Sequence, residues 1–218
     1  MYTPVTNESS AVDKYWSRYS PKLHRHIVFN SLMEYRNWLV VECNPYVKCF
    51  KEYPLDVQIP CGDHSVTIIF DMWVQYLGGE EKLIQLQYED DFLRSTSLSF
   101  HGLNVAEEWC KENDYTYSLV SNEGIYANEV YLENLEKIIT AVELLQKHFD
   151  LALQHELLQI LTVGEYTIKE LCKTTNKNRV EVYRMICWLL YTGICTTNLL
   201  GASLDDHSII KYTLSGHQ

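Results

Sequence analysis

Residues 66–88 read VTIIFDMWVQYLGGEEKLIQLQY, two β-type runs on either side of the pair Gly78-Gly79. Apolar and β-branched residues dominate both runs, and paired glycines are a turn signal. A shorter run at 55–59 precedes them, and the intervening CGDH at 61–64 predicts a hairpin. We therefore expect a three-strand meander made of 55–59, 66–76 and 83–88.

The segments on both sides of this meander have helical patterns. Ser31 and Glu34 have capping-box spacing, and the helical pattern that follows runs from 32 to 43, before Asn44-Pro45. Downstream, Asn104 is expected to cap a helix that leads into a strand at 115–120. A strand reached through a helix is a crossover connection, so we expect an α/β fold with a mixed sheet and flanking helices.

The remaining chain is predicted to be mostly helical. A long apolar pattern of period 3.6 over 128–145 predicts a helix that leads out of the first domain. Further helices are expected at 156–161, from the N-cap Thr167 onward, and at 179–191, and they precede two β-like segments at 194–199 and 207–214. Three helices followed by a hairpin is the order of a winged-helix domain. The predicted organisation is a flexible arm at 1–20, an α/β domain at 21–145 and a winged helix at 146–218.

The charge is unevenly distributed. The chain has 18 Lys and Arg against 29 Asp and Glu, a net charge of −11, whereas residues 145–218 contain seven of each sign. An acidic surface argues against broad nucleic-acid binding by the isolated protein, because phosphate contact depends on Lys and Arg. Local DNA contacts remain open at two places, and the residues concerned are Lys22, His24, Arg25, His26, Lys177 and Arg179. The alternatives are that the N-terminal segment packs on its domain and that the tail docks a protein.

Nothing in the sequence indicates secretion or a membrane. The polar N-terminal residues are unlike a signal peptide, and the longest apolar run, near 185–195, is too short to span a bilayer. Seven scattered cysteines without a C-x-x-C pair support neither a zinc site nor a disulfide framework. We expect a cytoplasmic protein with no membrane partner.

Four side chains are candidates for chemistry: Glu34 on the first helix, Asp71 in the second run, and Gln85 and Gln87 in the third. Alternation places the two glutamines on one face of their strand, and the hairpin connection can place Asp71 beside them. Two carboxylates, an amide oxygen and the Leu86 carbonyl can ligate Mg²⁺, which activates water in phosphodiester hydrolysis. Helix capping by Glu34 and solvent exposure of the glutamines explain the same pattern, so spacing alone leaves a structural role open.

Several segments together resemble a known family. They are SLMEYRNWL at 31–39, ECNPYV at 42–47, FKEYPL at 50–55, FDMW at 70–73, LIQLQY at 83–88, WCKENDYTY at 109–117 and Asn134-Leu135. In this order they resemble the TnsA family, the endonuclease subunits of heteromeric cut-and-paste transposases. The resemblance covers residues 20–145, and the winged-helix-like tail is similar to that of family members.

The resemblance implies a restriction-endonuclease-like fold and Mg²⁺- or Mn²⁺-dependent cleavage of the 5′ strand at transposon ends. It also implies three partners, namely the end DNA, a DDE transposase subunit (TnsB-like) and an AAA+ regulator (TnsC-like), in the prokaryotic nucleoid. Glu34 and Asp71 match the family's two metal-binding acids, and Gln85 matches the third ligand of its E/Q-x-K motif. Gln87 stands where the family has its catalytic lysine.

The replacement of that lysine leaves two interpretations open. An ammonium group orients the attacking water and opposes the charge that develops on phosphorus, whereas glutamine offers only dipoles. Loss of such a charge weakens transition-state stabilisation by several kcal/mol. The chain is therefore either an active nuclease in which Gln87 positions the water, or a degenerate subunit that serves as a DNA- and partner-binding scaffold. A winged-helix regulator with an unrelated first domain is a third reading, which leaves residues 1–145 unexplained.

Overall fold

The computed structural model describes residues 16–61, 64–87, 97–145 and 149–213. Within them the chain forms two compact units. The first contains residues 16–18, 26–41 and 46–127, and the second contains 19–25, 42–45 and 128–213. Helices surround a multi-strand sheet in the first unit, so the predicted α/β class is confirmed.

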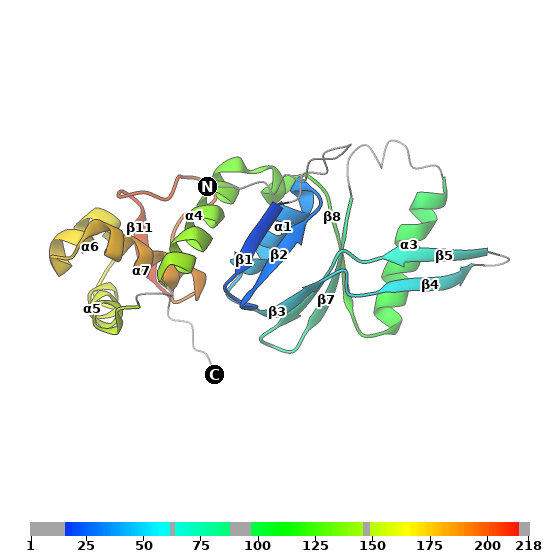
Figure 1. The fold of residues 1–218 in the computed structure, drawn as a ribbon, viewed down its shortest axis with the longest axis horizontal. Helices are drawn as coiled ribbons and strands as arrows, with labels where there is room; N and C mark the ends of the chain where they lie inside the picture. The colour runs from blue at the N-terminus through cyan, green and yellow to red at the C-terminus, as the bar shows by residue number, and fades with distance from the viewer. Residues whose placement is uncertain (1–15, 62–63, 88–96, 146–148, 214–218) are drawn as a thin grey trace. The chain divides into compact units, whose positions relative to one another are not determined.

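A four-stranded mixed sheet forms the centre of the first unit. Its strands, in spatial order, are β3 (Val47–Glu52), β6 (Met72–Tyr76), β7 (Glu81–Leu86) and β8 (Thr116–Val120) (Figure 1). The first three are antiparallel, and β8 runs parallel to β7 after the crossover helix α3 (Ser97–Glu112). Gly79 adopts a φ of 88° in the tight turn between β6 and β7, a conformation that glycine reaches without strain. The predicted mixed sheet and glycine turn are confirmed.

The predicted three-strand meander is wrong, although its first hairpin is confirmed. Within the described part of the chain, β4 (Asp56–Cys61) and β5 (His64–Ile69) pair only with each other, as a separate antiparallel hairpin. The second run is interrupted at Phe70-Asp71, where Phe70 is fully buried and the Asp71 N–H donates to the Ile84 carbonyl. β3 takes the place beside β6, a non-local pairing that short-range patterns do not specify.

Two other boundaries differ from expectation. α3 begins at Ser97, so Asn104 lies within the helix and does not cap it. Of the predicted arm, residues 1–15 lie outside the described part of the chain, and 16–20 form β1 (Trp16–Ser20), which pairs with β2 (Arg25–Phe29). Backbone pairing with β2 therefore orders the end of the segment that the sequence predicts to be flexible.

Helix α1 (Leu32–Glu42) forms where it was predicted. Ser31 Oγ accepts the Glu34 N–H at 3.1 Å, which satisfies one unpaired donor of the first turn. Trp38 is fully buried, and its ring lies 5.2 Å from that of Phe29 and 5.7 Å from that of Tyr35. This aromatic cluster anchors the helix and so fixes the position of its first turn. A 3₁₀ turn, η1 (Gly124–Ala127), ends the first unit.

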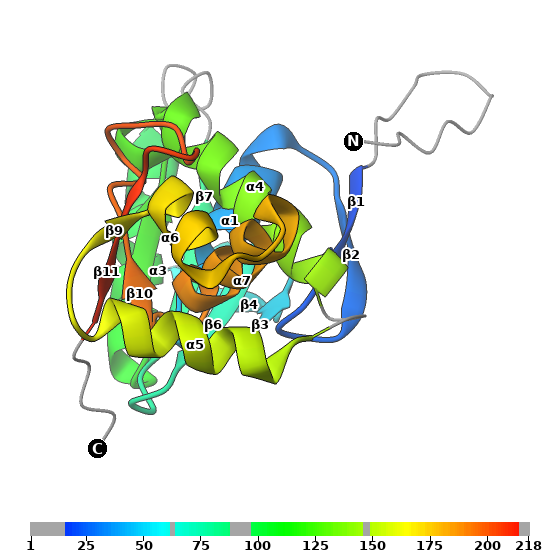
Figure 2. The ribbon, with the colours of Figure 1, turned by 90° about the vertical axis from the view of Figure 1, so that its left-hand side faces the viewer.

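The second unit consists of four helices and a small antiparallel sheet (Figure 2). The helices are α4 (Glu129–Leu145), α5 (Leu151–Leu161), α6 (Ile168–Thr175) and α7 (Arg179–Tyr191), and the strands are β9 (Tyr166–Thr167), β10 (Cys195–Thr196) and β11 (Ile209–Tyr212), in spatial order β10-β11-β9. The predicted helices are confirmed, as is the N-cap Thr167, which forms a full capping box with Glu170. α5 begins earlier than predicted, at Leu151, because Asp150 caps it by accepting the Leu153 N–H.

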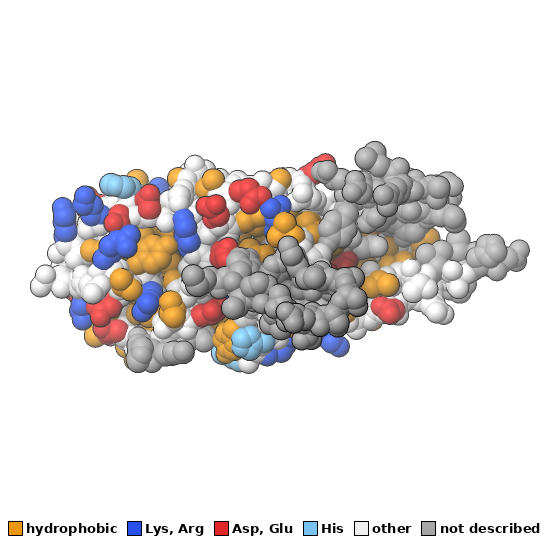
Figure 3. Space-filling view, turned by 45° about the horizontal axis from the view of Figure 1, so that its top comes forward, with side chains coloured by type: hydrophobic (Ala, Val, Ile, Leu, Met, Phe, Trp, Pro, Cys, Tyr) orange, Lys and Arg blue, Asp and Glu red, His pale blue; other side chains and the backbone are white. Residues whose placement is uncertain are grey.

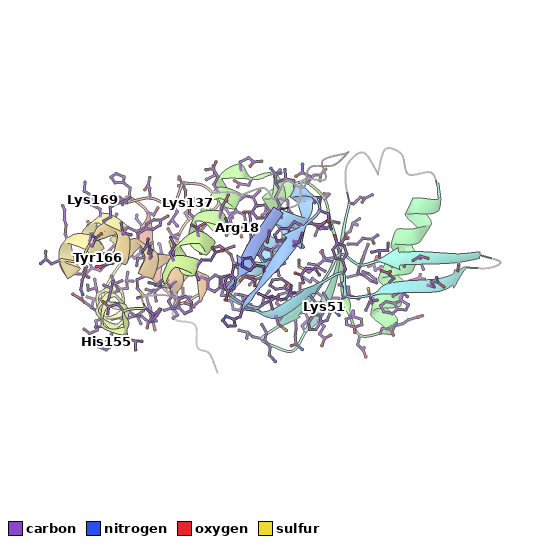
Figure 4. All side chains as sticks on the ribbon, in the orientation of Figure 1. Arg18, Lys51, Lys137, His155, Tyr166 and Lys169 are labelled. Atoms are coloured by element: carbon purple, nitrogen blue, oxygen red, sulfur yellow. The ribbon has the colours of Figure 1, made fainter. Side chains whose placement is uncertain are left out.

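Helix α4 is an integral part of the second unit. Its apolar residues Ile138 and Val142 share one core with Met185 and Leu189 of α7, and all four are buried. The fully buried Asn134 donates to the carbonyls of Leu199 and Ala202 and accepts the Leu204 N–H, and Lys137, labelled in Figure 4, donates to Ser203. The loop between β10 and β11 is therefore held against α4. None of the helices in the described ranges has the length and apolar character needed to cross a bilayer.

Candidate active site

Residues from separate segments of the first unit line one small pocket. The lining residues are Val28, Phe29, Glu34, Asn37, Glu52, Tyr53, Asp71, Met72 and Leu86. Three of them are carboxylates, and no lysine or arginine is among these described lining residues. The pocket therefore gathers negative charge.

Glu34 reaches the pocket from the first turn of α1. Its Oε2 accepts the main-chain N–H of Asn30 at 2.9 Å, one residue before the partner that a capping box would use. The capping pattern read from the sequence is thus half formed, since Ser31 still receives the Glu34 N–H. The carboxylate of Glu34 is fixed at the pocket by this contact.

Asp71 enters the same pocket from the interruption between β5 and β6. Its Oδ2 accepts the Leu86 N–H at 2.7 Å, which ties it to the end of β7. Burial raises the pKa of Asp71, the Leu86 hydrogen bond opposes that rise, and the negative charge of Glu34 adds to it. The structure thus brings Glu34 and Asp71 together, from positions 37 residues apart in the sequence.

The two glutamines are placed differently. Leu86 lines the pocket, and because neighbouring residues of a strand point to opposite faces, Gln85 faces the other side of the sheet. There its Oε1 accepts the Tyr117 hydroxyl at 2.8 Å, beside the core formed by Phe70, Leu83 and Cys110. Gln87 follows the end of β7, and its main-chain N–H donates to the Val120 carbonyl at 2.8 Å. Neither glutamine lines the pocket.

Lys22, predicted to contact DNA, is engaged within the second unit. Its N–H donates to Glu42, its Nζ lies 4.6 Å from the centre of the Tyr191 ring, and burial lowers its pKa. The other N-terminal candidates, His24, Arg25 and His26, are exposed in the β1–β2 turn and the start of β2.

The C-terminal candidates are each paired with a carboxylate. Lys177 Nζ lies 3.6 Å from Asp150, and Arg179 Nε donates to both carboxylate oxygens of Asp206, at 2.7 and 2.9 Å. Figure 3 shows the same mixture over the second unit, where lysine and arginine side chains alternate with acidic ones. A lysine or arginine that is already paired with a carboxylate binds a phosphate more weakly than an unpaired one, because binding must first break the existing ion pair.

Asn30 and Tyr53 are site residues that the sequence analysis did not identify. Asn30 Nδ2 donates to the Tyr53 hydroxyl at 2.9 Å, and Tyr53 lines the pocket with Glu34 and Asp71. Burial raises the pKa of Tyr53 to about 12, the hydrogen bond from Asn30 opposes that rise, and the charges of Glu34 and Asp71 add to it. No spacing rule links residue 30 to residue 53, so only the folded chain reveals the pair.

The donor set fits a hard divalent cation. Within the described ranges there is no group of three or more His, Cys, Asp or Glu side chains arranged to hold a metal. Mg²⁺, however, needs only one or two carboxylates, with waters and substrate phosphates as its other ligands. Glu34 and Asp71 meet that requirement, and a cation would offset their mutual repulsion.

Comparison with known proteins does not assign the chain to a group. No model of a known protein family matches the sequence, and a search of curated proteins finds no similar one.

Proposed function

We propose that this protein is a Mg²⁺-dependent DNA endonuclease subunit of a heteromeric transposase, similar to the TnsA family, that cleaves the 5′ strand at transposon ends. The observation that carries the proposal is the meeting of Glu34 and Asp71 in one acidic pocket at the end of β7. A carboxylate with a raised pKa in a pocket, as Asp71 has here, is typical of a functional site.

The order of elements is compatible with the two proposed folds. A helix, antiparallel strands, a crossover helix and a parallel strand follow one another in the first unit, as in a restriction-endonuclease-like domain. In the second unit the order of α5 to β11 is helix, strand, two helices and two strands, which suits a winged helix. DNA ends, a DDE transposase subunit and an AAA+ regulator are the proposed partners.

In this mechanism the chain supplies the ligands and their orientation. Mg²⁺ bound at the pocket would favour ionisation of a water and offset the charge developing on the phosphodiester. Glu34 and Asp71 would bind the cation, and the Leu86 N–H keeps the Asp71 carboxylate directed along β7. Gln87, just beyond that strand and not among the lining residues, would have to turn toward the pocket to orient the attacking water through its amide group.

A degenerate subunit is the second candidate, and the position of Gln85 favours it. Its amide oxygen, the proposed third ligand, is occupied by the Tyr117 hydroxyl on the opposite face of the sheet. Together with glutamine at position 87, this leaves the pocket with fewer of the groups that cleavage uses. Such a protein would hold DNA and partners without cutting.

Cleavage of end DNA by the reconstituted transposase tests the proposal. We expect Asp71→Ala to lower 5′-strand cleavage by about 10³-fold, since one of two ligands is lost. Asp56→Ala, a change at an exposed residue of β4, is the matched control and should cut normally. Equal products from wild type and Asp71→Ala would exclude the endonuclease function.

Gln87→Lys distinguishes the two candidates. If the site is active and lacks only the ammonium group, this substitution should raise the Mg²⁺-dependent rate by about 10-fold or more, because it adds a positive charge near the phosphate. An unchanged or lower rate would show that Gln87 does not occupy the lysine position.

A further inference from the structure

A set of hydrogen bonds links the Glu34 carboxylate to the main chain of Asp71 through Asn30 and Tyr53. The Asn30 main-chain N–H donates to Glu34, and its side-chain Nδ2 donates to the Tyr53 hydroxyl, both at 2.9 Å. The Tyr53 main-chain N–H then donates to the Asp71 carbonyl at 2.9 Å. Three segments that are distant in sequence, before α1, after β3 and before β6, are thus tied at the pocket.

The backbone of Tyr53 is strained in a way that supports a functional role. Its φ is 45°, in the left-handed region that a bulky residue rarely adopts. Such strain is found mainly at functional sites, where the surrounding contacts impose it. Here the hydroxyl and main-chain contacts with Asn30 and Asp71 hold the residue in that conformation.

The phenol of Tyr53 is the acceptor that holds the Asn30 side chain. Asn30 donates to this hydroxyl through Nδ2 and to the Glu34 carboxylate through its main-chain N–H, so a single residue links Tyr53 to Glu34. Without the Tyr53 acceptor, the segment that carries the Asn30 N–H loses its side-chain tether, and repulsion from Asp71 would favour Glu34 rotamers that point away from the pocket.

We propose that Asn30 and Tyr53 are a pair of positioning residues that hold the Glu34 carboxylate beside Asp71 in the arrangement a divalent cation needs. The inference rests on the proposed function, because it concerns the same pocket. It goes further in naming a hydroxyl and an amide, neither of them a ligand or a reacting group, as determinants of cation affinity.

Calorimetric titration of the full chain with Mn²⁺ tests this proposal, with Tyr53→Phe as the main variant. Loss of a partner that orients a ligand typically weakens metal binding by 10- to 100-fold, and we expect about a 10-fold higher Kd. Asn30→Ala keeps the main-chain N–H that donates to Glu34 and removes the same Asn30–Tyr53 bond from the other side, so its effect should be of similar size and in the same direction. Tyr212→Phe is the control, since Tyr212 is similarly exposed (37% against 45%) and belongs to the second unit.

The outcomes separate this proposal from the proposed function. Weaker Mn²⁺ binding by Tyr53→Phe, with an unchanged melting temperature in the absence of metal, supports the positioning role. Wild-type affinity in Tyr53→Phe and Asn30→Ala overturns it and leaves the endonuclease proposal intact. A wild-type chain that binds no Mn²⁺ at millimolar concentration overturns both.

Discussion

The two ends of helix α1 carry glutamates in opposite environments. Glu42, in the last turn, is fully buried and accepts hydrogen bonds from Ser20 Oγ at 2.7 Å, the Lys22 N–H at 2.9 Å and the Tyr191 hydroxyl at 2.7 Å. Glu34, in the first turn, lies in a pocket with two other carboxylates and no described cationic side chain. Hydrogen-bond donors therefore surround the Glu42 carboxylate, whereas the Glu34 carboxylate lies near other negative charges.

This difference separates a structural carboxylate from a functional one. A buried charge persists in a fold when hydrogen bonds replace its hydration, as they do for Glu42. An arrangement that brings carboxylates together lowers stability, and proteins retain such arrangements where binding or catalysis requires them. Substitutions at the two sites should therefore change stability in opposite directions.

Glu42→Ala should have the largest effect on stability. It removes the acceptor for three donors in the second unit, and at about 1 kcal/mol for each lost hydrogen bond the free energy of unfolding should fall by about 3 kcal/mol. Urea unfolding measures the change. Glu133→Ala, at an exposed position of α4, is the control and should stay within about 0.5 kcal/mol of wild type. Similar values for the two variants would contradict the structural role of Glu42.

Asp71→Asn should stabilise the protein, by up to about 1 kcal/mol at neutral pH. The amide oxygen can still accept the Leu86 N–H, and the repulsion from Glu34 disappears. Asp206→Asn is the matched change in the second unit, where it breaks an exposed ion pair with Arg179 and should lower stability by less than about 1 kcal/mol. Thermal unfolding of both variants provides the comparison, and a lower melting temperature for Asp71→Asn would show that Asp71 is structural.

Acidification should produce the smallest effect. Hydrogen bonds at helix N-termini lower two carboxylate pKa values: Leu153 donates to Asp150, and Thr167 donates to Glu170. The ionised carboxylates therefore stabilise the folded state at any pH above their ordinary pKa values, which are 3.8 for Asp150 and 4.5 for Glu170. This stabilisation is lost as the pH falls through the lowered values of the folded state. The raised pKa of Asp71 has the opposite effect on stability. The folded state binds this proton at a higher pH than the unfolded state does, so the free energy of unfolding increases as the pH falls from the raised pKa toward the ordinary one.

Melting temperatures between pH 7 and pH 3 measure these contributions. Glu170→Gln should flatten the acid limb of the wild-type curve, and Asp71→Asn should steepen it. An acid limb that neither substitution alters would show that other carboxylates control the pH dependence.

Much of the local structure was predictable, because it depends on residues close in sequence. The capping pair Thr167 and Glu170, the turn at Gly79 and the periodic helix α4 follow from contacts within a few positions. The interruption at Asp71 was not predictable, because the run from 66 to 76 is apolar or β-branched throughout except at that residue and near its end. Phe70 is buried against Trp109 and Tyr117, and this packing determines where the strand is interrupted. Those two residues lie far along the chain, so the local sequence does not show the contact.

The sequence by itself determined the helices, most of the strands, the mixed sheet and the residue types available for chemistry. Tertiary structure decided that β3 lies beside β6, that Gln85 faces away from the pocket and that Asn30 and Tyr53 connect Glu34 to Asp71. The reason is physical. Propensity, capping and alternation act over a few residues, whereas strand pairing and the meeting of carboxylates depend on which distant surfaces exclude water together.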